Sequence, residues 1–250
     1  MQGLHALVVE DDPDIASVIE ETLAAAGFEV TCAADGRAAV EAARSRPPDL
    51  VTLDITLPQM DGIEVLRHLR ETNDCYVVIV SARTDEIDRL VGLEVGGDDY
   101  IVKPFSPREL RARVAALFRR PRGSVGPDGS STEPDRPAGS EPDRSADTRS
   151  AVIDCGAGLL VDADRREVQI DGKTLDLTRI EYEILAHLAE RLGTVCTREE
   201  MVSAIWNSPL VHDHHLVDVH VANLRAKVSR HSDRSWLRTI RGIGYRLDRA

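Results

Sequence analysis

Short apolar runs alternate with longer segments of helical periodicity over the first 120 residues. The apolar runs lie at 6–9, 28–32, 50–53, 77–80 and 100–102. Apolar positions recur every three to four residues at 14–26, 37–46, 61–70, 85–95 and 107–119. Five strands alternating with five helices indicate an α/β fold, (βα)5, with a parallel sheet covered on both faces, because parallel neighbours need crossover connections.

A second pattern occupies the last 100 residues. Short β segments are expected over 159–177, with Asp171-Gly172 as a hairpin turn. Helices are expected at 178–192, 198–206 and 214–230, with a polar loop at 207–213. Two short strands flank Gly242-Ile243-Gly244 within 237–247. Three helices followed by a β-hairpin predict a winged helix-turn-helix, an α+β fold.

A stretch rich in Pro, Gly, Ser and Asp separates the two patterns. Residues 122–150 hold almost no large apolar side chain, so they cannot bury enough surface to offset the entropy cost of ordering. We expect a flexible tether with an r.m.s. span of about 30 Å, long enough for the two domains barely to touch. The predicted organisation is a first domain over 1–121, a linker over 122–151 and a second domain over 152–250.

The net charge of −12 argues at first against a nucleic-acid partner. The charge is, however, unevenly distributed, because residues 214–250 hold 8 Lys or Arg against 3 Asp or Glu. A basic end of this kind is the electrostatic feature that a phosphate backbone attracts.

Cysteine use and hydropathy indicate the compartment. The four cysteines are far apart and lack metal-ligand spacing, which favours reduced thiols. The chain has no 18-residue apolar run and no signal-peptide pattern, so we expect a cytoplasmic protein with no membrane partner.

Polar side chains stand where the predicted parallel strands end. Carboxylates follow the first and third strands, a hydroxyl the fourth and a lysine the fifth: Glu10-Asp11-Asp12, Asp54, Ser81 and Lys103-Pro104. Each alone is most often a helix cap or a loop charge, but these strand ends meet at the ligand-binding edge of an open sheet. Converging carboxylates need a hard cation, and oxygen ligands favour Mg²⁺ (or Mn²⁺). The facing ammonium and hydroxyl suit a phosphoryl group.

Four segments carry a resemblance to a known family. VVEDD (8–12), LDITLPQMDG (53–62), VSART (80–84) and GGDDYIVKPF (96–105) resemble the signatures of a response-regulator receiver domain, which implies a flavodoxin-like fold. The resemblance implies Asp54 as the phospho-acceptor. It also implies a metal pocket formed by Glu10, Asp11, Asp54 and the carbonyl of Thr56.

The same resemblance assigns the phosphoryl-binding and switch residues. Ser81 is the hydroxyl that hydrogen-bonds the phosphoryl oxygen, and Lys103 pairs with that oxygen. Tyr100 is the aromatic side chain that turns inward on activation. A cis peptide bond before Pro104 is also implied. The movement of Ser81 toward the phosphoryl group would bias a two-state equilibrium.

An aspartyl-phosphate phosphatase is the competing enzyme class. Such enzymes carry a second aspartate two residues after the nucleophile as general acid, and this chain has Thr56 there. No G-x-G-x-x-G or P-loop supports nucleotide binding. We therefore expect no enzyme beyond Mg²⁺-dependent, self-limited phosphorylation and dephosphorylation.

The second domain resembles the winged-helix effector domain of the OmpR/PhoB family. The matching segments are LTRIEYEIL (177–185), TREEMVSAIW (197–206), VDVHVANLRAKV (217–228) and TIRGIGYRL (239–247). The resemblance places helix 214–230 in the major groove of DNA and the hairpin in the adjacent minor groove.

Candidate DNA contacts lie on this helix and in the hairpin. They are His215, His220, Asn223, Arg225, Lys227 and Arg241. The core stripe of the helix is Val217, Val221, Leu224 and Val228. For Arg225 and Lys227 the alternative is a solvated helix face, and for His220 a satisfied site at the domain surface. Many relatives carry arginine at the positions of Ala222 and Asn223, so we expect fewer phosphate contacts and a modest affinity that dimerisation raises.

Dimerisation through the fourth helix, fifth strand and fifth helix is a further implication of the resemblance. The matching charges are Arg89 with Glu109, and Asp98 or Asp99 with Arg113. Exposed pairs of this kind contribute about 0–1 kcal/mol each.

The predicted function is that of a two-component response regulator. A sensor histidine kinase would phosphorylate Asp54, and the homodimer would bind direct-repeat half-sites in promoter DNA and act with RNA polymerase. Two alternatives stay open: a constitutive regulator that needs no phosphorylation, and a phosphorelay component whose winged helix binds protein.

Overall fold

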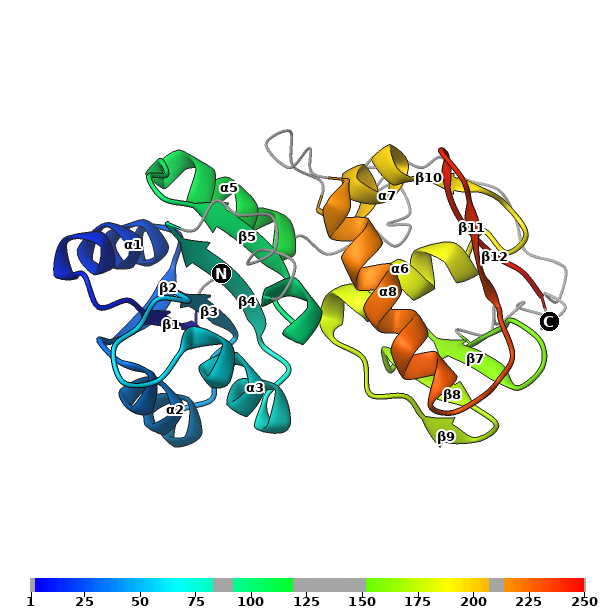
Figure 1. Ribbon diagram of the computed structural model, residues 1–250, viewed down its shortest axis with the longest axis horizontal. Helices are drawn as coiled ribbons and strands as arrows, with labels where there is room; N and C mark the ends of the chain where they lie inside the picture. Colours follow the sequence, from blue (N-terminus) through cyan, green and yellow to red (C-terminus); the bar gives the residue numbers. More distant parts are fainter. Residues whose placement is uncertain (1–2, 83–91, 119–151, 207–213, 250) are drawn as a thin grey trace, which may run out of the picture.

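The computed structural model describes residues 3–82, 92–118, 152–206 and 214–249, which form an N-terminal and a C-terminal unit (Figure 1). The N-terminal sheet consists of β1 (Leu4–Val9), β2 (Phe28–Ala33), β3 (Leu50–Leu53), β4 (Tyr76–Ser81) and β5 (Asp99–Val102). Its strands are all parallel, in the order β2-β1-β3-β4-β5. The predicted five-stranded parallel sheet is confirmed. The chain reverses direction across the sheet at β1 and β3, which makes their ends the expected ligand-binding edge.

Helices cover both faces of this sheet. They are α1 (Pro13–Ala25), α2 (Gly36–Ser45), α3 (Gly62–Thr72) and α5 (Pro107–Leu117). Contacts of α1 with α5 and of α2 with α3 show the two pairs, one on each side of the sheet (Figure 1). Residues 92–95 are helical, and the rest of the predicted helix 85–95 lies outside the described residues. Burial on both faces explains why β3 and β4 are buried along their whole length and, apart from Thr52 and Ser81, largely apolar.

Side chains at the helix starts fix where each crossover begins. Asp12 accepts hydrogen bonds from the backbone N–H groups of Asp14 and Ile15, and Asp61 accepts one from Ile63. Asp12 is thus a helix cap, the ordinary reading for a carboxylate before proline. These caps place the loops after β1 and β3 beside each other.

The C-terminal unit has the order predicted for a winged helix. An antiparallel sheet, β6 (Val152–Asp154), β7 (Leu159–Asp162), β8 (Glu167–Ile170) and β9 (Lys173–Thr174), precedes the helices. They are α6 (Arg179–Ala189), α7 (Arg198–Ile205) and α8 (His215–Ser229), with β10 (Cys196–Thr197) before α7. The hairpin of β11 (Leu237–Ile240) and β12 (Gly244–Leu247) follows. Strand β6 was missed by the sequence pattern, and the predicted loop 207–213 lies outside the described residues.

The core stripe predicted for α8 is confirmed. Val217, Val221 and Leu224 are buried, and Val228 packs against the same apolar cluster. Helix α8 is therefore attached to its own domain through this stripe.

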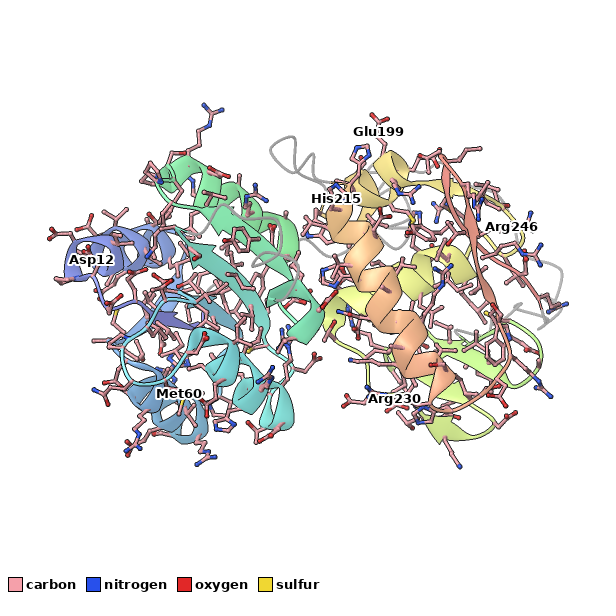
Figure 2. All side chains as sticks on the ribbon, viewed as in Figure 1. Asp12, Met60, Glu199, His215, Arg230 and Arg246 are labelled. Carbon is pink, nitrogen blue, oxygen red and sulfur yellow. The ribbon has the colours of Figure 1, made fainter. Side chains whose placement is uncertain are left out.

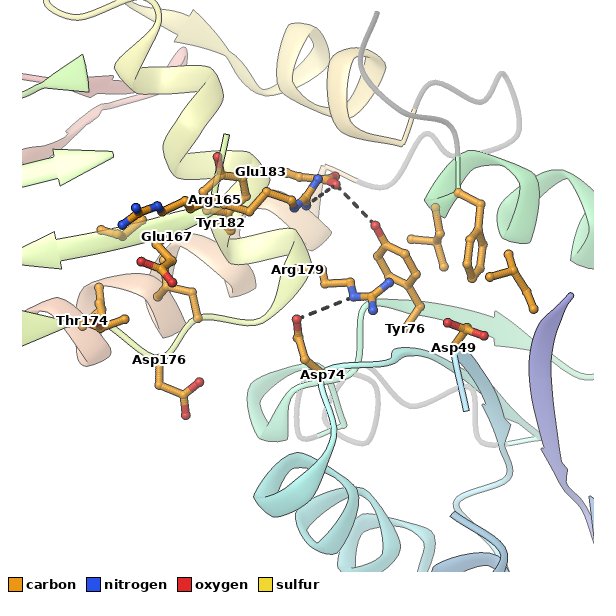
Figure 3. Close-up of a pocket in the computed structure, with 17 residues that line it drawn as sticks. Asp49, Asp74, Tyr76, Arg165, Glu167, Thr174, Asp176, Arg179, Tyr182 and Glu183 are labelled. Carbon is orange, nitrogen blue, oxygen red and sulfur yellow. Dashed lines mark hydrogen bonds and ion pairs between the residues drawn. The ribbon is translucent and has the colours of Figure 1, made fainter. Parts of the chain in front are cut away.

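The two units contact each other, so the expectation that they barely touch is wrong. Tyr76 Oη donates to Glu183 Oε1 at 3.3 Å, and Arg179 Nε lies 3.6 Å from Asp74 Oδ2 (Figure 3). One continuous cluster of buried apolar residues includes members of both units. The whole of the predicted linker, 122–151, lies outside the described residues.

The four cysteines are free thiols, as predicted. Cys32 is exposed, whereas Cys75, Cys155 and Cys196 are buried. Within the described residues, none of the helices has the length and apolar character needed to span a membrane.

Gly62, the first residue of α3, lies against the backbone that follows β3, which leads to a first prediction. A methyl group on Gly62 would overlap the backbone of Asp54 and Ile55. We predict that Gly62→Ala lowers the free energy of unfolding in urea by about 2 kcal/mol or more. Gly172→Ala is the control: its methyl meets nothing within 4 Å, and a φ of +77° costs only about 1–2 kcal/mol of backbone strain. A smaller loss at Gly62 than at Gly172 would contradict the prediction.

Candidate functional site

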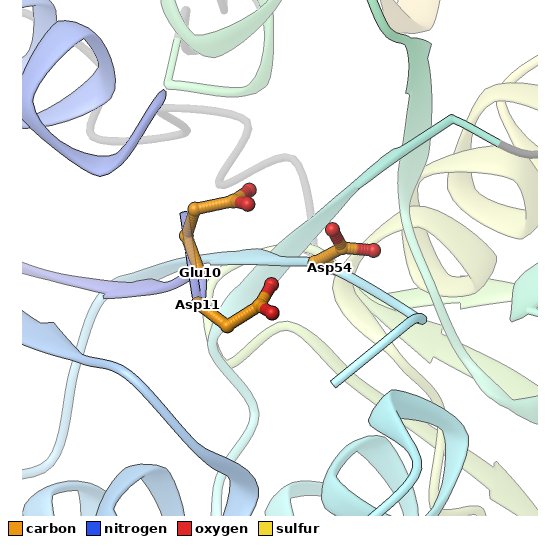
Figure 4. Close-up of side chains that lie close together, drawn as sticks. All are labelled: Glu10, Asp11 and Asp54. Atoms are coloured by element: carbon orange, nitrogen blue, oxygen red, sulfur yellow. The ribbon is translucent and has the colours of Figure 1, made fainter. Parts of the chain in front are cut away.

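Three carboxylates converge where β1 and β3 end (Figure 4). Glu10, Asp11 and Asp54 each offer an oxygen, and these oxygens lie within 4.8 Å of one another. Glu10 and Asp54 are buried, and Asp11 is exposed. The backbone holds them there, because Asp54 N–H donates to the Val9 carbonyl at 3.0 Å. The predicted convergence of the strand ends is therefore present.

Lys103 brings a positive charge into contact with two of these carboxylates. Its Nζ lies 2.7 Å from Glu10 Oε1 and 2.5 Å from Asp54 Oδ2. Burial lowers the pKa of Lys103, but the bonds to Asp54 and Glu10 outweigh burial and leave this pKa above its usual value. Burial raises the pKa of Glu10, and Lys103 opposes only part of the rise. One ammonium thus balances a cluster with a greater negative charge.

Of the other receiver residues predicted from the sequence, Thr56 contacts Asp54, and Ser81 and Tyr100 lie in strands β4 and β5. Thr56 N–H donates to Asp54 Oδ1 at 2.8 Å, which orients the carboxylate. Ser81 is fully buried at the end of β4, and its carbonyl accepts a hydrogen bond from Lys103 N–H at 2.9 Å. Tyr100 is buried in β5, within the apolar cluster on one face of the sheet. The expected cis peptide before Pro104 is present.

The donor set fits a hard divalent cation. All the side-chain ligands on offer are carboxylate oxygens, which suit Mg²⁺ or Mn²⁺ and do not suit zinc. Lys103 Nζ lies 2.6 Å from Glu10 Oε2 and 2.7 Å from Glu10 Oε1, so the ammonium contacts both oxygens of this carboxylate. A cation that bound to Glu10 would share these oxygens with Lys103.

Two of the six candidate DNA contacts are exposed. His215 is the first residue of α8 and is labelled in Figure 2. Arg241 lies in the turn between β11 and β12. The tip of the hairpin also exposes Ile243, 51% of whose surface is accessible. The hairpin therefore has the shape predicted for a wing, and its contacts with DNA stay a prediction.

Arg225 and Lys227 have partners inside the C-terminal unit. Arg225 Nη2 donates to the Thr239 hydroxyl at 2.7 Å, and Lys227 Nζ lies 2.7 Å from Glu181 Oε2. A merely solvated helix face, the alternative reading for both, is therefore wrong. DNA contact by either side chain would require an exchange of partners.

His220 and Asn223 face the N-terminal unit. His220 Nε2 is 3.3 Å from the Asp98 carbonyl, and Asn223 Nδ2 donates to the Leu93 carbonyl at 3.0 Å. Burial lowers the pKa of His220 to about 4, so the imidazole is neutral here. A neutral, buried imidazole offers no charge to a phosphate. The reading of His220 as a side chain satisfied at a surface fits this arrangement, and DNA contact stays a prediction for a different state.

The predicted dimer residues pair within one chain. Asp98 Oδ2 lies 2.7 Å from Arg70 Nη2, a partner that the sequence pairing did not include. Arg113 lies 3.0 Å from Asp99 and 3.1 Å from Glu109. Arg89 lies outside the described residues. The sequence did not predict Arg70 as a partner of Asp98, because the position of an arginine on a helix does not indicate which distant carboxylate it pairs with.

Lys103 generates the second prediction. We predict that Lys103→Met lowers the free energy of unfolding by about 3 kcal/mol at pH 8, because two buried carboxylates lose their cation. The loss shrinks at pH 5: the pKa of Glu10 is already raised, and protonation then ends the repulsion. Urea unfolding at both pH values measures this. Lys173→Met, on an exposed β9 residue, is the control, and equal losses at pH 5 and pH 8 would refute the charge argument.

Comparison with known proteins agrees with this geometry. The response regulator receiver domain family matches residues 6–115, and the family of transcriptional regulatory protein C-terminal domains matches residues 172–247. The alkaline phosphatase synthesis transcriptional regulatory protein PhoP of Bacillus subtilis is 35% identical over 97% of this chain and 95% of its own length. The transcriptional regulatory protein PrrA of Mycobacterium tuberculosis is 38% identical over the same shares.

Two further comparisons cover almost the whole chain. The transcriptional regulatory protein CpxR of Escherichia coli is 36% identical over 96% of this chain and 96% of its own. A solved structure of a RitR mutant covers 99% of this chain and 100% of that chain, with a TM-score of 0.71 and 22% identity, which shows a shared fold. This chain therefore belongs to the OmpR/PhoB family of two-component response regulators, transcriptional regulators that join a receiver domain to a winged-helix DNA-binding domain.

Proposed function

We propose that Asp54 accepts a phosphoryl group from a sensor histidine kinase and that this event controls DNA binding by α8 and the hairpin. The observation that carries the proposal is the convergence of Glu10, Asp11 and Asp54 within 4.8 Å around Lys103. Carboxylates that only cap helices or face solvent have no need to lie this close to one another. The cost of their mutual repulsion supports a role in binding a cation and a phosphoryl group.

The chemistry of transfer follows from the contacts of Asp54. One carboxylate oxygen attacks phosphorus, the phosphorus–nitrogen bond of the kinase phosphohistidine breaks, and the leaving imidazole takes up a proton. Thr56 N–H holds Oδ1, so Oδ2 is the oxygen that must exchange its Lys103 contact for phosphorus. The ammonium of Lys103 then pairs with a phosphoryl oxygen.

Glu10, Asp11 and Asp54, with the Thr56 carbonyl, would hold Mg²⁺ or Mn²⁺. The cation supplies charge neutralisation for the phosphoryl oxygens. The grouping of three carboxylate oxygens within 4.8 Å supports this assignment. Thr56 stands where an aspartyl-phosphate phosphatase carries its general-acid aspartate, which supports phosphorylation and reversal that are only self-limited.

Signal transfer would run through β4 and β5. Ser81 ends β4, and its carbonyl accepts a hydrogen bond from Lys103 N–H. A displacement of either residue would therefore displace the other. Tyr100 lies in the neighbouring strand β5 and is already buried. We propose that phosphorylation stabilises an alternative arrangement of this edge, including residues 92–99, and promotes a homodimer.

The proposed partners on the output side follow from the fold of the effector domain. Helix α8 would enter the major groove of promoter DNA and Arg241 the adjacent minor groove. A dimer would bind direct-repeat half-sites and act with RNA polymerase in the cytoplasm. The basic charge of residues 214–250 supports a DNA partner over a protein partner.

Asp54→Asn is the direct test of the acceptor. We predict that the variant takes up no label from acetyl [³²P]phosphate and shows no phosphorylation-dependent rise in DNA affinity, because an amide is not a nucleophile toward phosphorus. Asp61→Asn is a matched control, since Asp61 is an exposed cap in the same loop and asparagine caps equally well. Undiminished labelling of Asp54→Asn would refute the assignment. Labelling lost without any change in DNA affinity would favour the constitutive regulator.

Arg241→Ala tests the wing. We predict that the slope of log K against log salt becomes shallower by about 0.9, because one phosphate contact is lost. The measurement is a salt titration of binding to genomic fragments that the phosphorylated chain retains. Arg165→Ala is the control, an exposed arginine outside the helix and the hairpin. An unchanged slope would remove Arg241 from the interface, and binding without salt dependence would favour a protein partner.

A further inference from the structure

A cavity of about 310 Å³ lies within the effector domain, between the C-terminal half of α8 and the strands of the hairpin. Its lining comes from β7, α6, α8, the loop 232–236 and both strands of the hairpin. The buried apolar side chains of this lining are Leu159, Leu185, Leu224, Trp236, Leu237 and Leu247. Small-molecule sites in proteins have this size and this largely apolar interior.

Two arginines line the same cavity, and neither pairs with a carboxylate of the described residues. Arg225 Nη2 donates to the Leu237 carbonyl at 3.0 Å and to the Thr239 hydroxyl at 2.7 Å. Arg234 Nη1 donates to the Ala157 carbonyl at 2.7 Å. A guanidinium has five N–H donors, so both side chains can bind an anion in addition to these neutral acceptors.

The charges around the cavity favour an anionic ligand. Asp233 is the only carboxylate among the described residues of the lining, and its side chain is exposed. Two positive charges, on Arg225 and Arg234, therefore stand against one negative charge. Arginine can bind a carboxylate through two parallel hydrogen bonds, which fixes the orientation of the ligand. An apolar interior beside two arginines suits a molecule with an apolar body and one carboxylate.

We propose that this cavity binds a small monocarboxylate, with the apolar chain inside it and the carboxylate at Arg225 and Arg234. A water-sized group occupies about 30 Å³, so a cavity of about 310 Å³ holds about ten non-hydrogen atoms, the size of octanoate. The ligand would contact both α8 and the hairpin, the two elements proposed to bind DNA. Its binding needs no phosphoryl group on Asp54 and therefore does not depend on the proposed function.

The two tryptophans of the chain allow the site to be tested with octanoate. Trp236 lines the cavity, and its indole N–H donates to the Gly156 carbonyl at 3.0 Å, whereas Trp206 is buried outside the lining. In the full-length chain we expect octanoate to shift the indole N–H resonance of Trp236 saturably and to leave that of Trp206 in place. Sequential resonance assignment distinguishes the two signals. Equal shifts at both tryptophans, or none at Trp236, would overturn the proposal.

Arg234→Gln tests the charge, because it removes one cation and keeps a polar side chain at an exposed position. We expect the dissociation constant of octanoate, measured by calorimetric titration of the full-length chain, to rise about tenfold, since a charge-assisted hydrogen bond is lost. The neutral analogue 1-octanol should bind the wild type about as weakly as octanoate binds the variant. Arg238→Gln is the matched control, an exposed arginine outside the lining, and should leave octanoate binding unchanged.

Three results would overturn the assignment of a carboxylate site. One is equal affinity of the wild type for octanoate and 1-octanol, and another is an equal effect of Arg234→Gln and Arg238→Gln on octanoate. The third is no octanoate binding together with a weaker affinity of Arg234→Gln for DNA, which would assign this arginine to the phosphate backbone. The ligand titrations use the unphosphorylated chain, so a failure of Asp54 to accept a phosphoryl group would not affect them.

Discussion

The balance between one lysine and a cluster of carboxylates is the interaction on which the rest of the structure depends. A parallel sheet brings the ends of β1 and β3 together, so Glu10 and Asp54 are buried side by side. Lys103 arrives from the end of β5 and offsets that repulsion. A cluster neutralised only in part is poised to take up further positive charge.

A short stretch of backbone connects this cluster to the surface that contacts the effector domain. Lys103 is bonded through its backbone to Ser81, and β5 lies between Lys103 and the segment 93–98. That segment carries the carbonyls that α8 uses. The phosphoryl site and the docking surface are thus the two ends of one short strand. No long pathway through the core is required, since a displacement of β5 affects both ends at once.

Most of the fold and of the phosphoryl site could be predicted because both are local in sequence. Periodicity placed the strands and helices, and the strand ends placed Glu10, Asp54, Ser81 and Lys103. Pairings across the fold could not be predicted in this way. Arg70 reaches Asp98 across 28 residues, and His220 reaches it across 122, through contacts that no spacing encodes. Arg225 and Lys227 similarly turned to partners within their own domain.

His220 shows how one position can serve two states. Its side chain is polar enough to contact DNA and neutral enough to be buried against a carbonyl, which neither lysine nor arginine could be without a counter-ion. An arginine at Asn223 would likewise bring a full charge to the Leu93 carbonyl. The scarcity of cations on this face of α8 predicts few phosphate contacts. It also allows the helix to pack against the receiver without burying an unpaired charge.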